Sequence, residues 1–414
     1  MADTTQPTKA RVKKFSIAGY DMLAQVNMIS VWESIFKEHR TAQVKIIDTG
    51  NMINNLNLVG GMPASFSFDG FEDVSYDATM KLHSIKGEES NQSGRAKVYI
   101  LDLVDEEYFN NKKQIVQTAF QGITGTQAIA KLHAQFVNPN SPLRILAESM
   151  GPVSLQAHIV RSKRPYTAIQ EIMKKLNFAQ FASNPLYFKD KDGHVLAPLE
   201  GLFSQLSPLQ TLIEDTSLGK YWYEIFTSRN VIMQATAQID ISQNGRSGAA
   251  DVASNKYQQK MVFDHQTKTK IVEQGVRQIA GGLLNGVSGA LSQAFLDFSS
   301  LAGGQPNFWF MDGAHLPVAT DQSAGAEQSR LYAALVKNGP GMTIRCPIQS
   351  GLNLTVGKGV FLRLQPPIGD YEQQGYDATS GTFLITDLMH QVFTDMRKVQ
   401  ATTQFQCVRG GTNA

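Results

Sequence analysis

The sequence of 414 residues has few cysteines, few charged residues and no long apolar run. Its two cysteines, Cys346 and Cys407, are too few for a disulfide scaffold and form no Cys-x-x-Cys pair. No stretch of 18 apolar residues is present, which excludes a membrane-spanning helix. The polar start of the sequence lacks the apolar segment of a signal peptide. We therefore expect a soluble protein without membrane insertion, made in a reducing cytoplasm that keeps both cysteines as thiols.

The charge balance is nearly neutral, because 38 Lys and Arg against 36 Asp and Glu leave a formal net charge of +2. No overall field therefore attracts the chain to nucleic acid or anionic lipid. Charged residues make up 18% of the sequence, below the usual share of about 25%, while hydrophobic residues at 42% are typical of a folded protein. A surface poor in charge favours wide contacts with other proteins. The length predicts two to four domains.

Sequence motifs of catalysis and metal binding are missing. The segment 351–358 differs from a phosphate-binding loop, since five residues separate its glycines and Gly359 replaces the Ser or Thr. The segment 188–199 has no calcium ligand at its first and last positions. Asp105–Glu107 is interpreted as an acidic turn, and the eight histidines are scattered. We predict no catalytic residue, no cofactor and no metal site.

The first quarter of the chain has the alternating pattern of β-strands. Residues 1–14 are interpreted as a flexible arm with a short basic run. A first β domain is predicted for residues 15–109, with a short helix or turn at 51–56. Gly, Asn and Asp turns separate its expected strands, which suggests an antiparallel sheet or barrel formed by residues 42–48, 61–70, 76–85 and 95–104.

A helix-rich middle domain is predicted for residues 110–220. Helices are expected at 110–120, at 164–178 and at 207–213, the last because Ser207 and Pro208 resemble a capped helix start. The basic run 161–165 leaves two interpretations open. It forms either a solvated surface or a contact with phosphate or a protein partner.

The C-terminal part, residues 221–414, is predicted to be a second β domain. It contains a Gly-, Ala- and Ser-rich insertion at about 243–330. Residues 276–298 of this insertion are apolar but rich in glycine, so a mobile insertion ordered by a partner, a buried helix and a membrane-active segment all remain open. Cys346 and Cys407 lie on predicted strands that could be neighbours. Strands are expected at 231–241, 256–264, 341–348, 352–367, 380–393 and 398–410.

Three patches of sequence resemble one known family. The stretch 31–68 resembles the N-terminal tube-like domain of baseplate hub proteins from contractile-tailed bacteriophages. The stretches 352–364 and 380–393 resemble the closing segment of that family, and 160–176 with 184–205 is similar to its helix and strand–Asp-Gly–strand unit. The patches cover about a third of the chain, and the 243–330 insertion has no counterpart. The matching positions are Glu33, Ser34, Asp48, Gly61, Asp192, Gly193, Asn353, Thr355, Gly357, Asp387 and His390.

The resemblance implies an α+β, mainly β fold in which two tail-tube-like antiparallel β-barrel domains flank a helix-containing middle region. It further implies a homotrimer, whose six barrels match the sixfold tail tube to the threefold central spike. The implied partners are the tail tube protein, the central spike protein, baseplate wedge proteins, the tape-measure protein and passing DNA, which is not recognised by sequence. The implied location is the tail baseplate of the virion, after assembly in the host cytoplasm.

A structural hub that forms part of the DNA ejection channel is the function implied by this resemblance. We expect Asn, Gln, Thr and acidic residues to line the channel, because a basic wall would retain phosphates. Three alternatives remain open: the hub of a related contractile injection system, a tail-associated glycan-degrading enzyme, and a host-binding adhesin. The enzyme would need a pair of carboxylates in a cleft.

Overall fold

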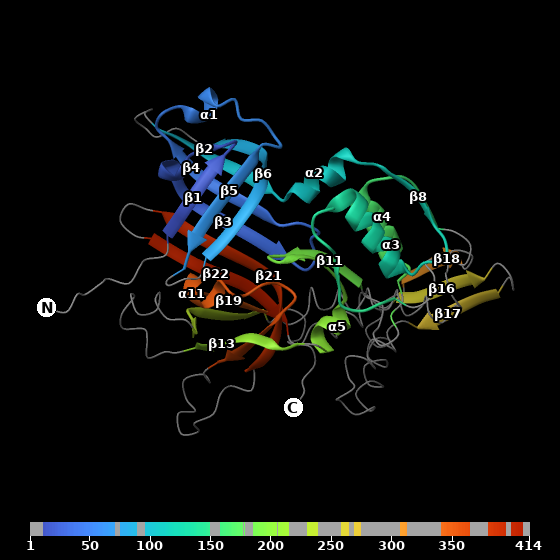
Figure 1. Ribbon diagram of the computed structural model, residues 1–414. Helices are drawn as coiled ribbons and strands as arrows, with labels where there is room; N and C mark the ends of the chain where they lie inside the picture. The colour runs from blue at the N-terminus through green and yellow to red at the C-terminus, as the bar shows by residue number, and fades with distance from the viewer. Residues whose placement is uncertain are drawn as a thin grey trace, which may run out of the picture.

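The computed structural model is built mainly of β-strands, and most of its helices lie in the middle of the sequence (Figure 1). The strands of the residues that the structure describes form a 14-stranded sheet and three smaller sheets of two, three and three strands. The predicted α+β, mainly β class is confirmed. The structure describes residues 11–70, 75–88, 96–149, 158–176, 178, 185–204, 206–214, 230–238, 258–264, 269–274, 307–312, 341–364, 380–394 and 399–408.

The N-terminal strands form one antiparallel part of the large sheet, in which β3 and β4 lead to β7, β6, β5, β1 and β2. Although β1 is several strands away from β21 in the order of the sheet, it contacts β21, so this part of the sheet curls around its own core. The four strands predicted at 42–48, 61–70, 76–85 and 95–104 are confirmed as β4, β5, β6 and β7. The strand bounds are β1 Arg11–Ile17, β2 Tyr20–Asp21, β3 Val26–Ser34, β4 Thr41–Asp48, β5 Pro63–Asp69, β6 Ser75–Glu88 and β7 Lys97–Val104.

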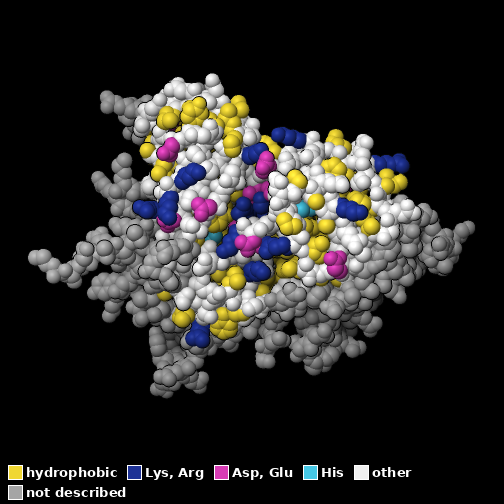
Figure 2. Space-filling view, in the orientation of Figure 1, with side chains coloured by type: hydrophobic (Ala, Val, Ile, Leu, Met, Phe, Trp, Pro, Cys, Tyr) yellow, Lys and Arg dark blue, Asp and Glu magenta, His cyan; other side chains and the backbone are white. Residues whose placement is uncertain are grey.

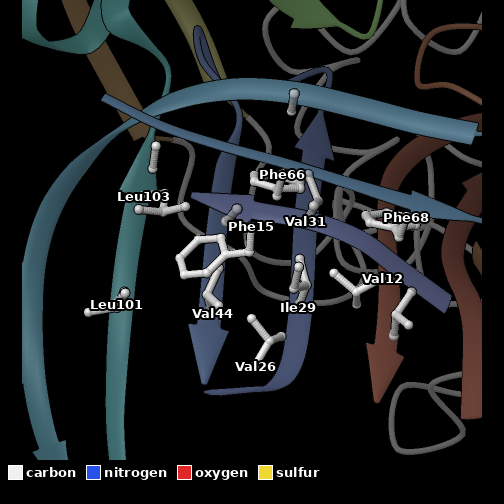
Figure 3. Close-up of a cluster of buried hydrophobic side chains, with 14 of the residues drawn as sticks. Val12, Phe15, Val26, Ile29, Val31, Val44, Phe66, Phe68, Leu101 and Leu103 are labelled. Carbon is white, nitrogen blue, oxygen red and sulfur yellow. The ribbon is translucent and has the colours of Figure 1, made fainter. Parts of the chain in front are cut away.

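The core of this part is formed by alternate side chains that point inward from each strand (Figure 3). Phe15, Phe66 and Phe68 are each at most 1% exposed. The same core also contains Val392 and Ala401, which come from the C-terminal strands. The first β core therefore depends on both ends of the sequence, while the domain limits stay a prediction.

Residues 11–14 belong to a strand, which corrects the prediction of a flexible arm for these four residues. Val12 is buried in the first core, and Nζ of Lys13 lies 2.7 Å from Oδ2 of Asp69 on the neighbouring strand β5. The basic side chains are thus on the exposed face of β1, while its apolar side chains point into the core. Residues 1–10 lie outside the described residues.

A long C-terminal hairpin joins the two parts of the large sheet. The first half of β21 pairs with β20 and its second half pairs with β3, while β22 follows β21 along its length. A second apolar core lies on the far half of this hairpin and includes Ile344, Leu362 and Phe405. The bounds are β13 Pro208–Glu214, β14 Val231–Ile232, β15 Gln234–Gln238, β19 Gly341–Pro347, β20 Gly359–Arg363, β21 Gly381–Thr394 and β22 Val399–Val408.

The middle of the chain forms a third core beside the two sheet parts (Figure 1). The helix predicted at 164–178 is confirmed as α4, which begins at Pro165 and buries Ile169 and Ile172. Thr124 and Gln127 form a capping box at the start of α3. The bounds are α2 Glu106–Lys113, β8 Val116–Phe120, α3 Gly125–Leu132, a π-helical turn at His133–Val137, β9 Arg144–Ile145, β10 His158–Lys163, α4 Pro165–Met173, β11 Pro185–Asp190, β12 Gly193–Pro198 and α5 Leu199–Ser204.

Two helix predictions are wrong in part or in whole. The predicted helix at 110–120 ends at Lys113, because Val116 and Phe120 point inward from strand β8 while Gln117 and Ala119 are exposed. The predicted helix at 207–213 is strand β13, which runs parallel to β20. Proline is tolerated at the first residue of a strand, and pairing with β20 outweighs the local capping signal.

Three short helical segments connect strands of the large sheet: a 3-10 turn at Leu23–Gln25, α1 at Met52–Asn55 and α11 at Ile348–Gly351. The helix α1 confirms the short helix predicted at 51–56. Within the predicted insertion, β16 Gln258–Asp264, β17 Thr269–Gln274 and β18 Asn307–Asp312 form a three-stranded sheet. The segment 276–298 lies outside the described residues.

The two cysteines are buried free thiols on neighbouring strands. Cys346 pairs in register with Thr403, and Cys407 pairs with Met342. The cysteines are therefore offset by four residues, or about 13 Å along the strands at about 3.3 Å a residue. They lie on adjacent strands but are not adjacent to each other.

Candidate functional site: a polar junction and a polar sheet face

A buried group of polar side chains lies where the first core, the middle region and the C-terminal part meet. We call it the polar junction. Figure 2 shows Lys, Arg, Asp and Glu side chains close together on the surface over the boundary between the first sheet and the middle region. The polar junction consists of Glu33, Arg40, Tyr76, Asp105, Glu107, Lys189 and Thr355.

The ion pair between Arg40 and Asp105 is the centre of the polar junction. Nη2 of Arg40 lies 3.1 Å from Oδ1 of Asp105, and its backbone N–H donates to Oδ2 over 2.8 Å. Arg40 also donates from Nη1 to the Tyr76 hydroxyl over 3.2 Å. Burial would raise the pKa of Asp105, but Arg40 and Lys189 outweigh it and hold that pKa below its ordinary value.

Lys189 of β11 extends the network into the middle region. Its Nζ lies 3.2 Å from Oδ1 of Asp105 and 2.8 Å from Oε1 of Glu107, and its side chain is only 12% exposed. Asn138 donates to the same Oε1 of Glu107 over 2.6 Å. The interpretation of Asp105–Glu107 as an acidic turn is therefore corrected for its two ends. Both carboxylates are buried at the start of α2, where cations from other elements compensate them.

Glu33 connects the first sheet to the C-terminal part. Its Oε2 accepts from the Thr355 hydroxyl over 3.0 Å, and its Oε1 accepts from the Tyr76 hydroxyl over 3.3 Å. Burial raises the pKa of Glu33 to about 7, although Arg40 and the two hydrogen bonds act in the opposite direction. A carboxyl group at this position therefore changes charge near neutral pH.

We predict that Glu33→Gln stabilises the protein at alkaline pH. The pKa of Glu33 is raised on folding. Below about pH 4.5 the carboxyl group is protonated in both states and costs no stability. As the pH rises from there through about 7, the unfolded state ionises first, so the free energy of unfolding falls. The gain from Glu33→Gln should grow by about 2–3 kcal/mol between pH 5 and pH 8.5, measured by urea unfolding. The surface control Asp77→Asn should show no such growth. An equal gain at both pH values would contradict the prediction.

His390, a position of the family resemblance, lies next to the polar junction. Its Nδ1 is 2.9 Å from the Thr403 hydroxyl, and its ring centroid is 5.4 Å from that of Tyr76. Burial, aided by the charge of Lys191, lowers the pKa of His390 to about 3. The imidazole is therefore neutral at physiological pH and packs as part of the first core.

Four more of the resemblance positions lie close to this region. Ser34 and Asp387 are register partners between β3 and β21. The backbone N–H of Gly357 donates to the carbonyl of Ile385 over 2.9 Å. Gly193 follows the turn in which Oδ1 of Asp190 accepts its backbone N–H over 3.0 Å.

The four remaining positions of the family resemblance lie in turns or next to them. Asp192, in the same turn as Gly193, donates its backbone N–H to Oδ1 of Asp190 over 2.8 Å. Asn353 is exposed on the loop before Thr355. Asp48 accepts the backbone N–H groups of Met52 and Ile53 over 3.0 Å each, which holds the start of α1. Gly61 has a φ of +92°, which favours glycine. Asp48 and Gly61 belong to the α1 region and not to the polar junction.

The positions of the family resemblance do not include Arg40, Tyr76, Asp105 and Lys189 of the polar junction. Each is a single polar residue in an otherwise ordinary segment, and their partners are far apart in the chain. The one available signal is the run of three acidic residues, 105–107, directly after the apolar strand β7. That signal does not distinguish a buried helix start from an exposed turn.

A second feature is a polar face that crosses both parts of the large sheet. In register across β7, β4, β3, β21 and β22, one row contains Asp102, Gln43, Ser30, Gln391 and Thr402. Gln43 donates to Asp102 over 2.9 Å and Gln391 donates to Ser30 over 3.1 Å. These residues all lie on the side of the strands that faces away from the apolar cores.

The same face continues onto the C-terminal strands. Asp387 pairs with Gln406, which pairs with Thr343 on β19. Gln404 pairs with Arg345 on β19 in the neighbouring row. We define the polar sheet face as the outward residues Ser30, Gln43, Asp102, Thr343, Arg345, Asp387, Gln391, Thr402, Gln404 and Gln406.

Within the described residues, no group of three or more His, Cys, Asp or Glu side chains is arranged to hold a metal ion. No helix in the described part of the chain is long and apolar enough to cross a membrane.

Comparisons with solved structures identify the fold. A tail protein from Neisseria meningitidis MC58 aligns with a TM-score of 0.58 at 13% identity, covering 97% of this chain and 96% of that protein. The 43 kDa tail protein of prophage MuSo2 from Shewanella oneidensis aligns with a TM-score of 0.56 at 10% identity, covering 97% and 99%. The chain has the fold of a phage tail protein.

The likeness extends over the whole tail-protein fold, since both alignments cover nearly all of both chains. A component of the type VI secretion system of E. coli aligns with a TM-score of 0.47 at 9% identity, covering 97% of this chain and 76% of that protein. No family model and no curated protein matches the sequence.

Proposed function

We propose that the chain is the structural baseplate hub of a phage tail, which adapts the sixfold tail tube to the threefold central spike. The polar sheet face is the observation that carries this proposal. One sheet, continuous through the hairpin β21–β22, joins two cores and carries rows of polar side chains across both, which alternate with rows that contain Trp32, Met389 and Phe393. Three such chains would offer six similar sheet parts to the tube and three copies of the whole chain to the spike.

The chemistry of the polar sheet face suits a channel through which DNA passes. Amide and hydroxyl side chains dominate it, together with the carboxylates of Asp102 and Asp387 and one cation, Arg345. The cation Lys86 beside the face is neutralised, because its Nζ lies 2.8 Å from Oδ2 of Asp102. A wall of this kind holds few fixed positive charges, so it does not retain phosphates.

The proposed role needs several partners, all of them components of the tail. They are two further copies of the chain, the tail tube protein, the central spike protein, wedge proteins and the tape-measure protein. Its place is the baseplate of the virion, and its role is mechanical and not enzymatic. The polar junction would then fix the two sheet parts and the middle region relative to one another under load.

We predict that the purified protein forms trimers. Light scattering after size separation should give a mass near three times 45.5 kDa, either alone or once the central spike protein is added. The trimer should then bind the end of preformed tail tubes, visible by negative-stain electron microscopy. A dimer, a tetramer, or a monomer that stays monomeric with the spike protein would contradict the proposal.

A further inference from the structure

The two-stranded ribbon β8–β10 covers the third core with one face and exposes the other. His158 pairs with Phe120 and Val160 pairs with Thr118, and these residues lie on the inner side. On this side Phe120 and Val160 pack into the core. The ribbon has no third strand within the described residues. Its outer face and its edges are therefore available to another molecule as far as the described chain shows.

The centre of the outer face is apolar. Ile159 is 52% exposed and pairs in register with Ala119 on β8, which is also exposed. Ile115, directly before β8, is 63% exposed, the largest value among the large hydrophobic residues that the structure describes. Exposed branched side chains on a pleated surface favour a packing partner.

Basic side chains border this apolar centre. Arg161 and Lys163 belong to the exposed end of β10, and Arg164 follows directly. Lys163 pairs in register with Val116, which places this end of β10 beside Ile115. Figure 2 shows Lys and Arg side chains next to hydrophobic ones over β8.

Two lysines from α2 lie at the same end of the ribbon. The backbone N–H of Tyr166 donates to Oδ1 of Asn111 over 2.9 Å, so the end of α2 lies against the start of α4. Lys112 and Lys113 follow Asn111 and are exposed. This basic rim is formed by Lys112, Lys113, Arg161, Lys163 and Arg164.

Little acidic charge compensates the basic rim. Nζ of Lys163 lies 2.9 Å from Oε1 of Glu171, and Lys112 lies over the ring of Tyr108 at 5.2 Å. Arg161 and Arg164 have no acidic partner among the residues that the structure describes. Unpaired cations around an apolar centre are complementary to a surface of the opposite charge.

The end of β10 is shaped by a bulge that presents the cations. The register shifts between Val160 and Lys163, and Ser162 has a φ of +50°, which is uncommon for a residue other than glycine. Nε2 of Gln117 donates to the Ser162 hydroxyl over 3.3 Å and links the bulge to β8. The bulge leaves Arg161, Ser162 and Lys163 exposed in succession, where a regular strand would turn alternate residues inward.

We propose that the outer face of the β8–β10 ribbon binds an acidic segment of a partner protein, whose apolar side chains cover Ile115 and Ile159. A protein segment fits better than nucleic acid, because a phosphate backbone offers nothing to pack on the apolar centre. Of the two interpretations of the basic run 161–165, this binding mode corresponds to contact with a protein partner. It rests on the proposed function, because the partner is another component of the tail.

Site-specific photo-crosslinking in assembled tails tests this inference. Ile159 is replaced by the photoreactive residue p-benzoylphenylalanine, and purified tails are illuminated and analysed by mass spectrometry. Exposed Thr79 on β6 carries the same residue as a matched control. We expect the Ile159 position, and not the Thr79 position, to link to a partner-protein segment with a negative net charge.

Charge reversal supplies the second arm. Arg161→Glu with Arg164→Glu should lower the yield of that crosslink at least about tenfold, because like charges would then face each other. Lys14→Glu on β1 should leave the yield unchanged. A crosslink to DNA, to a second copy of the chain or to a neutral or basic segment overturns the inference, as does the absence of any crosslink. Absence of the chain from purified tails overturns the proposed function instead.

Discussion

Arg40→Met is expected to destabilise the protein by about 3–5 kcal/mol, because the substitution leaves Asp105 buried without its main counter-charge. Asp105 is 1% exposed and Arg40 is 8% exposed, so water replaces little of the lost interaction. The Tyr76 hydroxyl also loses the donor at 3.2 Å. Lys189 still faces Asp105 over 3.2 Å, which limits the loss. Urea unfolding at pH 7 measures the change.

A double-mutant cycle separates the ion pair from general damage to the core. Asp105→Asn in the Arg40→Met background removes the uncompensated charge. It keeps an acceptor for the backbone N–H of residue 40. The double variant should therefore recover about 2 kcal/mol relative to additivity. Lys13→Met, which breaks a surface pair with Asp69, should cost at most about 1 kcal/mol. Strict additivity of the two junction substitutions would contradict a direct interaction.

The polar junction explains how a chain with three apolar cores is held as one body. Glu33 belongs to the first sheet, Asp105 starts the first helix of the middle region, and Thr355 lies in the C-terminal part. Apolar packing between these parts has no direction, whereas hydrogen bonds and ion pairs fix a particular arrangement. For a protein that would transmit force between a tube and a spike, such fixed geometry is the useful property.

The sequence predicts those elements whose signal is local. Strands β4, β5 and the first half of β6 largely alternate apolar and polar residues, and α4 combines a proline at its first turn with an apolar stripe, so these elements are recognised without knowledge of the fold. The strand β13 is missed because Ser207 and Pro208 imitate a helix start. Its actual state depends on pairing with β20, about 150 residues further along the chain.

The candidate sites are less predictable than the fold, since both depend on pairs that are distant in sequence. The sequence places Glu33 and Thr355 in separate patches of the family resemblance, and only the fold brings them to 3.0 Å. Arg40 carries no recognisable pattern at all. The polar sheet face likewise depends on register, because a shift of one residue would exchange Gln391 for the buried Val392.

Gly357→Ala is expected to cost about 2–4 kcal/mol, because it combines backbone strain with overpacking. The φ of Gly357 is +75°, and a Cβ at this position would lie 2.7 Å from Cζ of Phe188. Phe188 is 1% exposed in the second core, so its ring has little room to move. Thermal and urea unfolding of the purified variant measure the loss.

Two control glycines separate the two causes of this loss. Gly19 has a φ of +87° with no atom within 4 Å of an added Cβ, so Gly19→Ala reports strain alone, about 1–2 kcal/mol. Gly87 has neither feature, and Gly87→Ala should be close to neutral. Phe188→Leu should reduce the additional cost of Gly357→Ala, because the shorter side chain leaves room for the methyl group. If Gly357→Ala costs no more than Gly19→Ala, the contact with Phe188 does not constrain this turn, and the requirement for glycine is one of backbone conformation only.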